Sequence, residues 1–378
     1  MVEVLLVVGL AVAVFVGFNI GGSSTGVAFG PAVGSKSISK IGAAALMTAF
    51  ALLGGATVGT EVVETMGGEI VPTSEFTLAA SVTVLFFVGA ALLISNLFGV
   101  PASTSMTAVG AIAGLGVATG SIRWDVMGQI VSWWLVAPII AFWVCAMIGR
   151  YLYPHLEARF TFESPGDERT TKELLGQVLV VVIGCYMAFS AGASNVANAV
   201  APLVGAGAIG LYPGVALAGG AIGLGAFTIA RRTLDTVGTG LTDLPIMAAL
   251  IVEVISATII SLLSWGGIPA SLAVSATMCI VGLGWGRATR TTTISQAATA
   301  AVTGEATSRT DGSLSVDALA DSEPGGEVPG IGEEDRAELT AGDLFDPAAT
   351  GRVITLWVLT PTFSALASFL VFEFVPIV

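Results

Sequence analysis

Histidine, cysteine and charged residues are scarce in this chain. Its 378 residues include one histidine and three cysteines, and only 11% are charged, against about 25% in a soluble globular protein. His155 lies in a polar stretch, while Cys145, Cys185 and Cys279 each lie in an apolar run without a Cys-x-x-Cys pair. This excludes a disulfide framework and leaves almost no material for histidine-based chemistry. We expect a protein that is not an enzyme, with no cofactor and no nucleic-acid partner.

Apolar residues, by contrast, make up 54% of the chain. A helix that spans the hydrocarbon core of a bilayer, about 30 Å thick, needs about 20 such residues. Ten runs approach that length, and they lie near residues 2–20, 41–60, 79–98, 105–120, 126–150, 174–191, 207–230, 245–266, 271–289 and 352–374. The predicted fold class is an all-α integral membrane protein, embedded in the lipid bilayer of the cell membrane.

Most of the net charge of −13 falls in one polar stretch. Between residues 304 and 347 there are twelve acidic residues and two arginines, which gives −10 for this stretch. Because it also lacks an apolar period, we expect segment 291–350 to be a disordered insert. We interpret it as a solvated linker, with a regulatory or partner-binding loop as the alternative.

Two Gly- and Ser-rich segments, 21–35 and 192–206, are too polar to face lipid. We expect each to break its helix as a re-entrant element that does not cross the bilayer, since irregular backbone at that depth must line a cavity or be buried in protein. Thirteen of the fourteen basic residues then lie on the cytoplasmic side and only Arg123 lies outside. The positive-inside rule therefore places both termini outside and the acidic insert in the cytoplasm.

The two halves of the chain resemble each other. Three pairs of segments align, with prolines on prolines and closing glycines on closing glycines in the first two pairs. The pairs are 21–35 with 192–206, 101–116 with 269–284, and Trp134-x-x-x-Pro138 with Trp357-x-x-x-Pro361. With five crossings in each half, the copies must have opposite orientations.

The repeats divide the chain into five parts. These are a first transmembrane repeat at 1–150, a cytoplasmic linker at 151–173, the first part of a second repeat at 174–290, the insert at 291–350 and a last helix at 351–378. Inverted repeats with a polar break at the same place in each half are typical of secondary transporters, whose substrate site lies near the midplane. A channel is the second choice, and a membrane enzyme or a structural protein follows.

Hydroxyls and amides are the polar groups available at the predicted site. The substrate-binding candidates are Ser23, Ser24, Thr25, Ser103, Thr104, Ser105, Ser194, Asn195, Asn198 and Ser271. None of these segments contains Lys, Arg or His, so a charged ligand would be held by neutral donors and by the positive ends of short helices. Such a site suits a small tetrahedral oxyanion better than a bulky organic substrate. Each hydroxyl taken alone could instead bond to its own helix.

Several motifs of this chain resemble signatures of the inorganic phosphate transporter (PiT) family. They are GASNVANAVAP, PASTS, the GTGLT run that ends at Thr242 and the Trp-x-x-x-Pro pairs. The resemblance covers nearly the whole chain except the acidic insert. It implies symport of inorganic phosphate with Na⁺ or H⁺ through two inverted repeats that alternate in access. A homodimer is the assembly to consider.

This chain departs from those signatures where the family places an acid, at Ser24 and Asn195. In the second half Leu272 and Ala273 also replace two hydroxyl residues. A buried carboxylate can accept the proton of HPO₄²⁻, whereas SO₄²⁻ has none to donate. Phosphate is the usual substrate in this family, which favours phosphate here as well. Because the carboxylates are lost, a sulfate permease is the alternative.

One acid remains inside an apolar run. Glu253 lies near the centre of 245–266 and is a candidate for holding the coupling ion, because an acid at the midplane is costly unless it is paired or protonated. A protonated structural acid is the equal alternative. Asn19 and Asn96, at the ends of runs, are second-rank site candidates.

Overall fold

The computed structural model describes residues 2–97, 103–159, 171–230, 234, 246–289 and 347–375, which form helices joined by turns. The longer helices are α1 (Val2–Gly34), α2 (Lys40–Thr57), α4 (Leu78–Leu97), α5 (Thr104–Ala118), α6 (Trp124–Met147), α8 (Thr171–Gly205), α9 (Leu211–Thr228), α11 (Ile246–Trp265), α12 (Leu272–Ala288) and α14 (Pro347–Phe374). The shorter ones are α3 (Gly59–Glu64), η1 (Thr65–Glu69), η2 (Thr73–Glu75), η3 (Ile148–Leu152) and α7 (Tyr153–Arg159).

Each of the ten apolar runs that the sequence predicts contains a helix in the described part of the chain. In the described part of the chain, seven helices are long and apolar enough to cross a membrane, and three apolar helices, within α4, α5 and α12, are shorter. The GTGLT run, the Asn96 side chain and the acidic insert as far as residue 346 lie outside the described residues.

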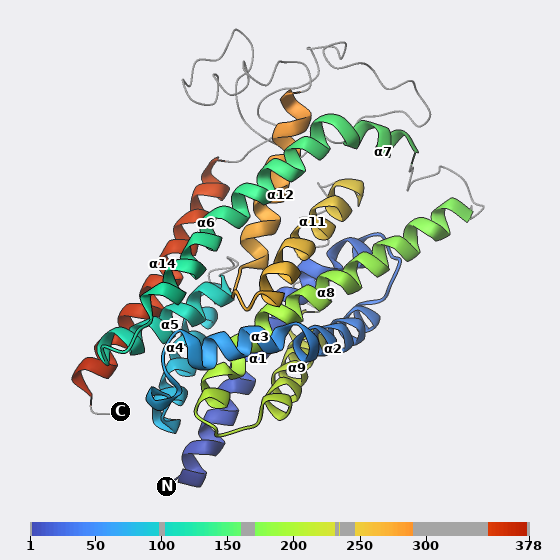
Figure 1. Ribbon diagram of the computed structural model, residues 1–378. Helices are drawn as coiled ribbons and strands as arrows, with labels where there is room; N and C mark the ends of the chain where they lie inside the picture. The colour runs from blue at the N-terminus through green and yellow to red at the C-terminus, as the bar shows by residue number, and fades with distance from the viewer. Residues whose placement is uncertain are drawn as a thin grey trace.

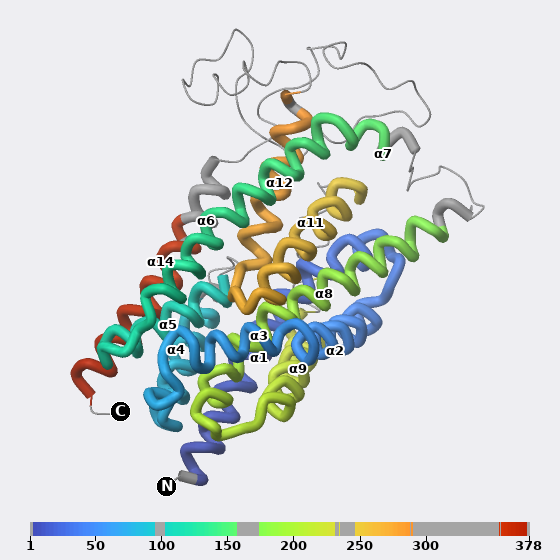
Figure 2. Tube along the Cα trace, in the orientation of Figure 1, coloured from blue at the N-terminus to red at the C-terminus, as the bar shows by residue number. Residues whose placement is uncertain are grey.

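Two pairs of helices form hairpins in the middle of the molecule (Figure 1). Helix α4 packs on α5, and α11 packs on α12. The hairpins are flanked by the long helices α6 and α14, with α5 along α14 and α12 along α6. Helices α1, α2, α8 and α9 pack together as the other part of the bundle (Figure 2).

The prediction that 21–35 and 192–206 interrupt their helices is wrong. Helices α1 and α8 run through these segments without a break and are 33 and 35 residues long. The polar side chains are accommodated within the helix, because a hydroxyl can donate to a carbonyl of the preceding turn. Thr25, for example, donates to the carbonyl of Gly21 at 2.7 Å. Between α11 and α12, by contrast, residues 266–271 are not helical.

Glycines in these segments let the helix backbones approach closely. A Cβ atom at Gly21 of α1 would lie 1.9 Å from the carbonyl oxygen of Ile222 on α9. Likewise, a Cβ atom at Gly192 of α8 would lie 2.1 Å from the carbonyl oxygen of Ala51 on α2. No side chain fits at these separations, so the glycines are required by packing.

This packing predicts the effect of one added methyl group. Gly192→Ala should lower the free energy of unfolding by about 1–3 kcal/mol, because α8 must move away from α2. The matched control is Gly220→Ala in α9, where a Cβ atom would meet nothing within 4 Å. Thermal unfolding of the purified protein in detergent measures both variants. Equal midpoints for the two would contradict the account of the α2 and α8 contact.

Candidate functional site

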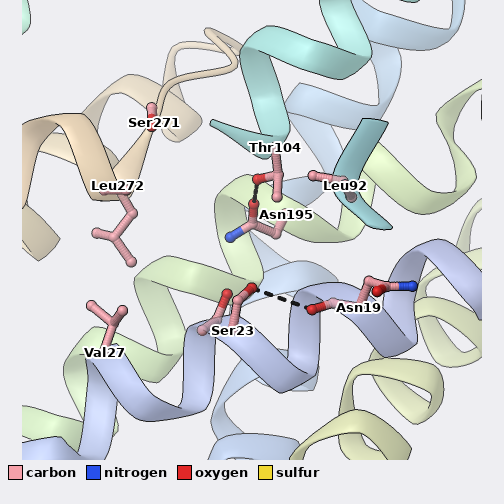
Figure 3. Close-up of a pocket in the computed structure, with 10 residues that line it drawn as sticks. Asn19, Ser23, Val27, Leu92, Thr104, Asn195, Ser271 and Leu272 are labelled. Carbon is pink, nitrogen blue, oxygen red and sulfur yellow. Dashed lines mark hydrogen bonds between the residues drawn. The ribbon is translucent and has the colours of Figure 1, made fainter. Parts of the chain in front are cut away.

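A cavity of about 60 Å³ lies where the two hairpins meet α1 and α8. Its lining residues come from α1, α4, α5, α8 and the start of α12: Asn19, Ser23, Ser24, Val27, Leu92, Thr104, Asn195, Ser271, Leu272 and Ala273. None of them is charged, and most of the polar ones carry hydroxyls (Figure 3). The volume suits a small inorganic ion or a few waters, because pockets for drug-sized ligands measure about 300–1,000 Å³.

Two helices begin beside this cavity. Ser103 is the N-cap of α5 and accepts from the backbone N–H of Met106 at 3.3 Å. Ser271 is the N-cap of α12 and accepts from the backbone N–H of Val274, also at 3.3 Å. The first turn of a helix leaves four N–H groups without a partner in that helix, and its dipole adds about half a positive charge. The two N-termini therefore favour an anion in the cavity.

Buried side chains behind the cavity connect α8 to both hairpins. Ser194 donates to the carbonyl oxygen of Ala270, just before α12, at 2.7 Å, and its hydroxyl lies 3.2 Å from that of Ser105 on α5. Thr104 of α5 donates to Oδ1 of Asn195 on α8. These bonds hold the start of each short helix against the middle of α8.

Asn198 lies one turn beyond Asn195 and completes this network. Its amide nitrogen lies 3.1 Å from Oδ1 of Asn195, 3.2 Å from the hydroxyl of Ser105 and 3.3 Å from that of Thr104. Asn198 is fully buried and Asn195 is 5% exposed. The two amides are therefore almost completely buried, and of the two only Asn195 lines the cavity.

Half of the ten candidates from the sequence line the cavity, namely Ser23, Ser24, Thr104, Asn195 and Ser271. The other half lie around it. Ser105, Ser194 and Asn198 form the network behind the cavity, Ser103 caps α5, and the Thr25 hydroxyl is bonded within α1.

The second-rank candidate Asn19 also lines the cavity. Its amide nitrogen donates to the Phe15 carbonyl at 2.8 Å, on the side away from Asn195 (Figure 3). Sequence reasoning missed the apolar part of the lining, such as Leu272 and Val27. The repeat contained a signal for Leu272, since it stands where the first half has Thr104.

Glu253 does not line the cavity. It lies in α11, is 4% exposed, and neither carboxylate oxygen has a hydrogen-bond partner among the described residues. A carboxylate so buried and unpartnered is costly in its charged form.

The fold is that of a multi-pass membrane protein with a small cavity, lined by uncharged side chains, where its hairpins meet α1 and α8. The chain matches the family described as "Phosphate transporter family" over residues 20–368. It therefore belongs to the phosphate transporter family, whose members are transporters and not enzymes.

One known protein is similar to this chain in sequence, and another is similar in fold. The sulfate permease CysP of Bacillus subtilis is 33% identical over 273 residues, covering 72% of this chain and 75% of that protein. The solved structure of a protein named "The sodium-dependent phosphate transporter" matches the fold with a TM-score of 0.71 at 17% identity, over 98% of both chains.

The site geometry predicts a difference between two adjacent hydroxyls. Ser24 lines the cavity and its hydroxyl has no hydrogen bond in the described part of the chain, so it is available to a ligand. Ser24→Ala should weaken binding of a labelled tetrahedral oxyanion, sulfate or phosphate, by about tenfold or more, since a hydrogen bond to a charged group contributes about 1.5–3 kcal/mol. Thr25→Val is the control, because the Thr25 hydroxyl is bonded to Gly21 within α1. Equal affinities of the two purified variants would remove Ser24 from the site.

Proposed function

We propose that this protein is a secondary active transporter that takes up a small tetrahedral oxyanion, with sulfate as the first candidate. The observation that carries the proposal is a cavity with hydroxyl and amide side chains, bounded by the N-termini of α5 and α12, without a charged side chain in its lining. Neutral donors and helix N-termini are well suited to an oxyanion. The identity to a sulfate permease over most of both chains supports the same substrate.

The protonation of the anion separates sulfate from phosphate. Phosphate carries at least one proton at neutral pH and binds best where a carboxylate accepts it, whereas sulfate carries none. The cavity lining contains no carboxylate, because Ser24 and Asn195 stand where an acid would be expected from the family signature. Phosphate remains the second candidate, favoured by the description of the family and by the name of the protein whose solved structure shares this fold.

Inverted repeats and alternating access form the mechanistic part of the proposal. The close contact of Gly21 with Ile222 has a counterpart in that of Gly192 with Ala51, and one offset of 171 residues exchanges the two contacts. Helix pairs are exchanged in the same way, since α5 with α14 corresponds to α6 with α12. Such reciprocal packing is what a two-fold relation between inverted copies would produce.

We also propose that both termini lie outside the cell and that the acidic insert is cytoplasmic. The distribution of lysine and arginine supports this orientation. The fold supports the same orientation. The start of α1 and the end of α14 lie at one end of the molecule, opposite α7 and the end of α12 (Figure 1).

For coupling we propose symport with a cation, either Na⁺ or H⁺, and assign Glu253 to the coupling site. Its buried carboxyl group without a hydrogen-bond partner among the described residues is a natural carrier of a proton or an oxygen ligand for Na⁺. The position of Glu253 outside the cavity lining implies that the cation and the anion are bound separately.

Transport assays test the substrate directly. Proteoliposomes with the purified protein should accumulate labelled sulfate when a Na⁺ or an H⁺ gradient is imposed, and the rate should saturate with sulfate. Empty liposomes are the control. Uptake of phosphate without sulfate would favour the second candidate, while an ohmic current without saturation would indicate a channel.

Replacement of Glu253 tests the coupling assignment. Glu253→Gln keeps the shape of the side chain and removes its ability to ionise, so accumulation driven by the cation gradient should fall by about tenfold or more. Equilibrium exchange of labelled sulfate should continue, because Glu253 does not line the cavity. Ser264→Ala, at another buried position of α11, is the control. Unchanged accumulation and unchanged cation dependence would exclude Glu253 from coupling.

A further inference from the structure

Asn195 has a defined orientation at the cavity. Its Oδ1 atom accepts from the hydroxyl of Thr104 and from the amide of Asn198, the latter at 3.1 Å. Its amide nitrogen points the other way, into the space between Ser23 and Leu272 (Figure 3). The Asn195 side chain therefore presents two N–H groups to a ligand and keeps its oxygen away from it.

The reverse orientation is disfavoured by Asn198, whose nitrogen also donates to the Thr104 hydroxyl and so leaves that hydroxyl to donate to Asn195. If the Asn195 amide turned over alone, its nitrogen would face the amide nitrogen of Asn198, which is also a donor. If both amides turned over, the nitrogen of Asn198 would move to the place of its Oδ1 atom, which is buried and has no partner among the described residues. The turned-over state would then leave two amide N–H groups unpaired there in place of one carbonyl oxygen, which is more costly. Thr104 and Asn198 thus hold the amide in one state.

The other polar groups in the lining are bonded to different degrees. Ser23 donates to two carbonyls of its own helix, at 3.1 and 3.2 Å, and Ser271 accepts from a backbone N–H group of α12. The amide nitrogen of Asn19 likewise donates to a carbonyl of α1. Ser24 has no hydrogen bond among the described residues, so its hydroxyl can donate or accept. Asn195 is the lining amide whose nitrogen is directed at the cavity.

We propose that Thr104 and Asn198 are positioning residues that make Asn195 a fixed hydrogen-bond donor, and that this triad selects fully deprotonated oxyanions over protonated ones. The inference rests on the proposed function as an oxyanion transporter and specifies the chemical class of its substrates. Sulfate and selenate, which carry no proton at neutral pH, are accepted. Phosphate and arsenate, which carry at least one, have fewer bare oxygens to accept from the N–H groups of Asn195 and are bound more weakly.

Competition measurements with labelled sulfate test whether the protein prefers fully deprotonated oxyanions. In proteoliposomes that contain the wild-type protein, selenate should inhibit sulfate uptake at concentrations about tenfold below those needed for arsenate or phosphate, as expected when one hydrogen bond to a charged group is lost. Equal inhibition by selenate and arsenate would overturn the proposal while leaving sulfate transport itself intact. Wild-type protein that takes up phosphate and not sulfate would also overturn the proposal and leave phosphate, the second candidate, as the substrate, whereas a protein that takes up no oxyanion would contradict the proposed function.

Variants of Thr104 test the positioning role. Thr104→Val removes the donor to Asn195 and should reduce the ratio of selenate to arsenate affinity by about tenfold, since Asn198 alone then holds the amide in place. Thr104→Ser keeps the hydroxyl and should retain the wild-type ratio, a rescue that a loss of packing alone would not produce. An unchanged ratio in Thr104→Val, with Asn195 still needed for binding, would contradict the role of Thr104.

Asn195→Asp gives the converse result. An acid at this position offers an acceptor to the cavity, so the variant should lose sulfate binding and gain phosphate binding, most strongly at lower pH where phosphate carries more protons. Binding of labelled sulfate and labelled phosphate to the purified variant measures this directly, and the thermal midpoint shows that it is folded. If the reconstituted Asn195→Asp variant is unstable, the Thr104 pair provides the test. A folded Asn195→Asp protein that still prefers sulfate would overturn the proposal.

Discussion

The central physical constraint in this protein is that two helices begin in its interior. The first N–H groups of α5 and α12 have no partner within their own helices, and in an apolar bundle water is not there to supply one freely. Ser103 and Ser271 cap one N–H group each. The remaining positive potential is directed at the cavity, so the oxyanion that we propose as the substrate would also complete the hydrogen bonding of these helix ends.

Two kinds of helix contact surround this cavity. Within the group of α1, α2, α8 and α9, backbones touch at glycines such as Gly21 and Gly192, which leaves little freedom for sliding. Between α8 and the hairpins the contacts are hydrogen bonds of hydroxyls and amides, such as that of Ser194 with the carbonyl of Ala270. Polar bonds can exchange partners at low cost, whereas interlocked backbones cannot. A boundary of this kind suits movement of one part against the other during transport.

Sequence patterns predicted the helices well but placed the breaks wrongly. Apolar runs set the position of every long helix, because burial in lipid requires them. Composition could not show that the hydroxyl of Thr25 bonds within its own helix, so 21–35 was mistaken for a broken segment. For the site, the repeat brought out Thr104, Asn195 and Ser271, which do line the cavity. The orientation of the Asn195 amide depends on Asn198 and Thr104 together, and only the fold brings these side chains together.

Location of a bound anion is the most direct test of the central claim. Selenate has the shape and charge of sulfate, and selenium gives an anomalous X-ray signal that marks its position in crystals of the protein. The account predicts one strong anomalous peak in the cavity, within hydrogen-bonding reach of Ser24, Asn195 and the first turn of α12. A peak elsewhere in the molecule, or an empty cavity in crystals of protein that transports selenate, would contradict it.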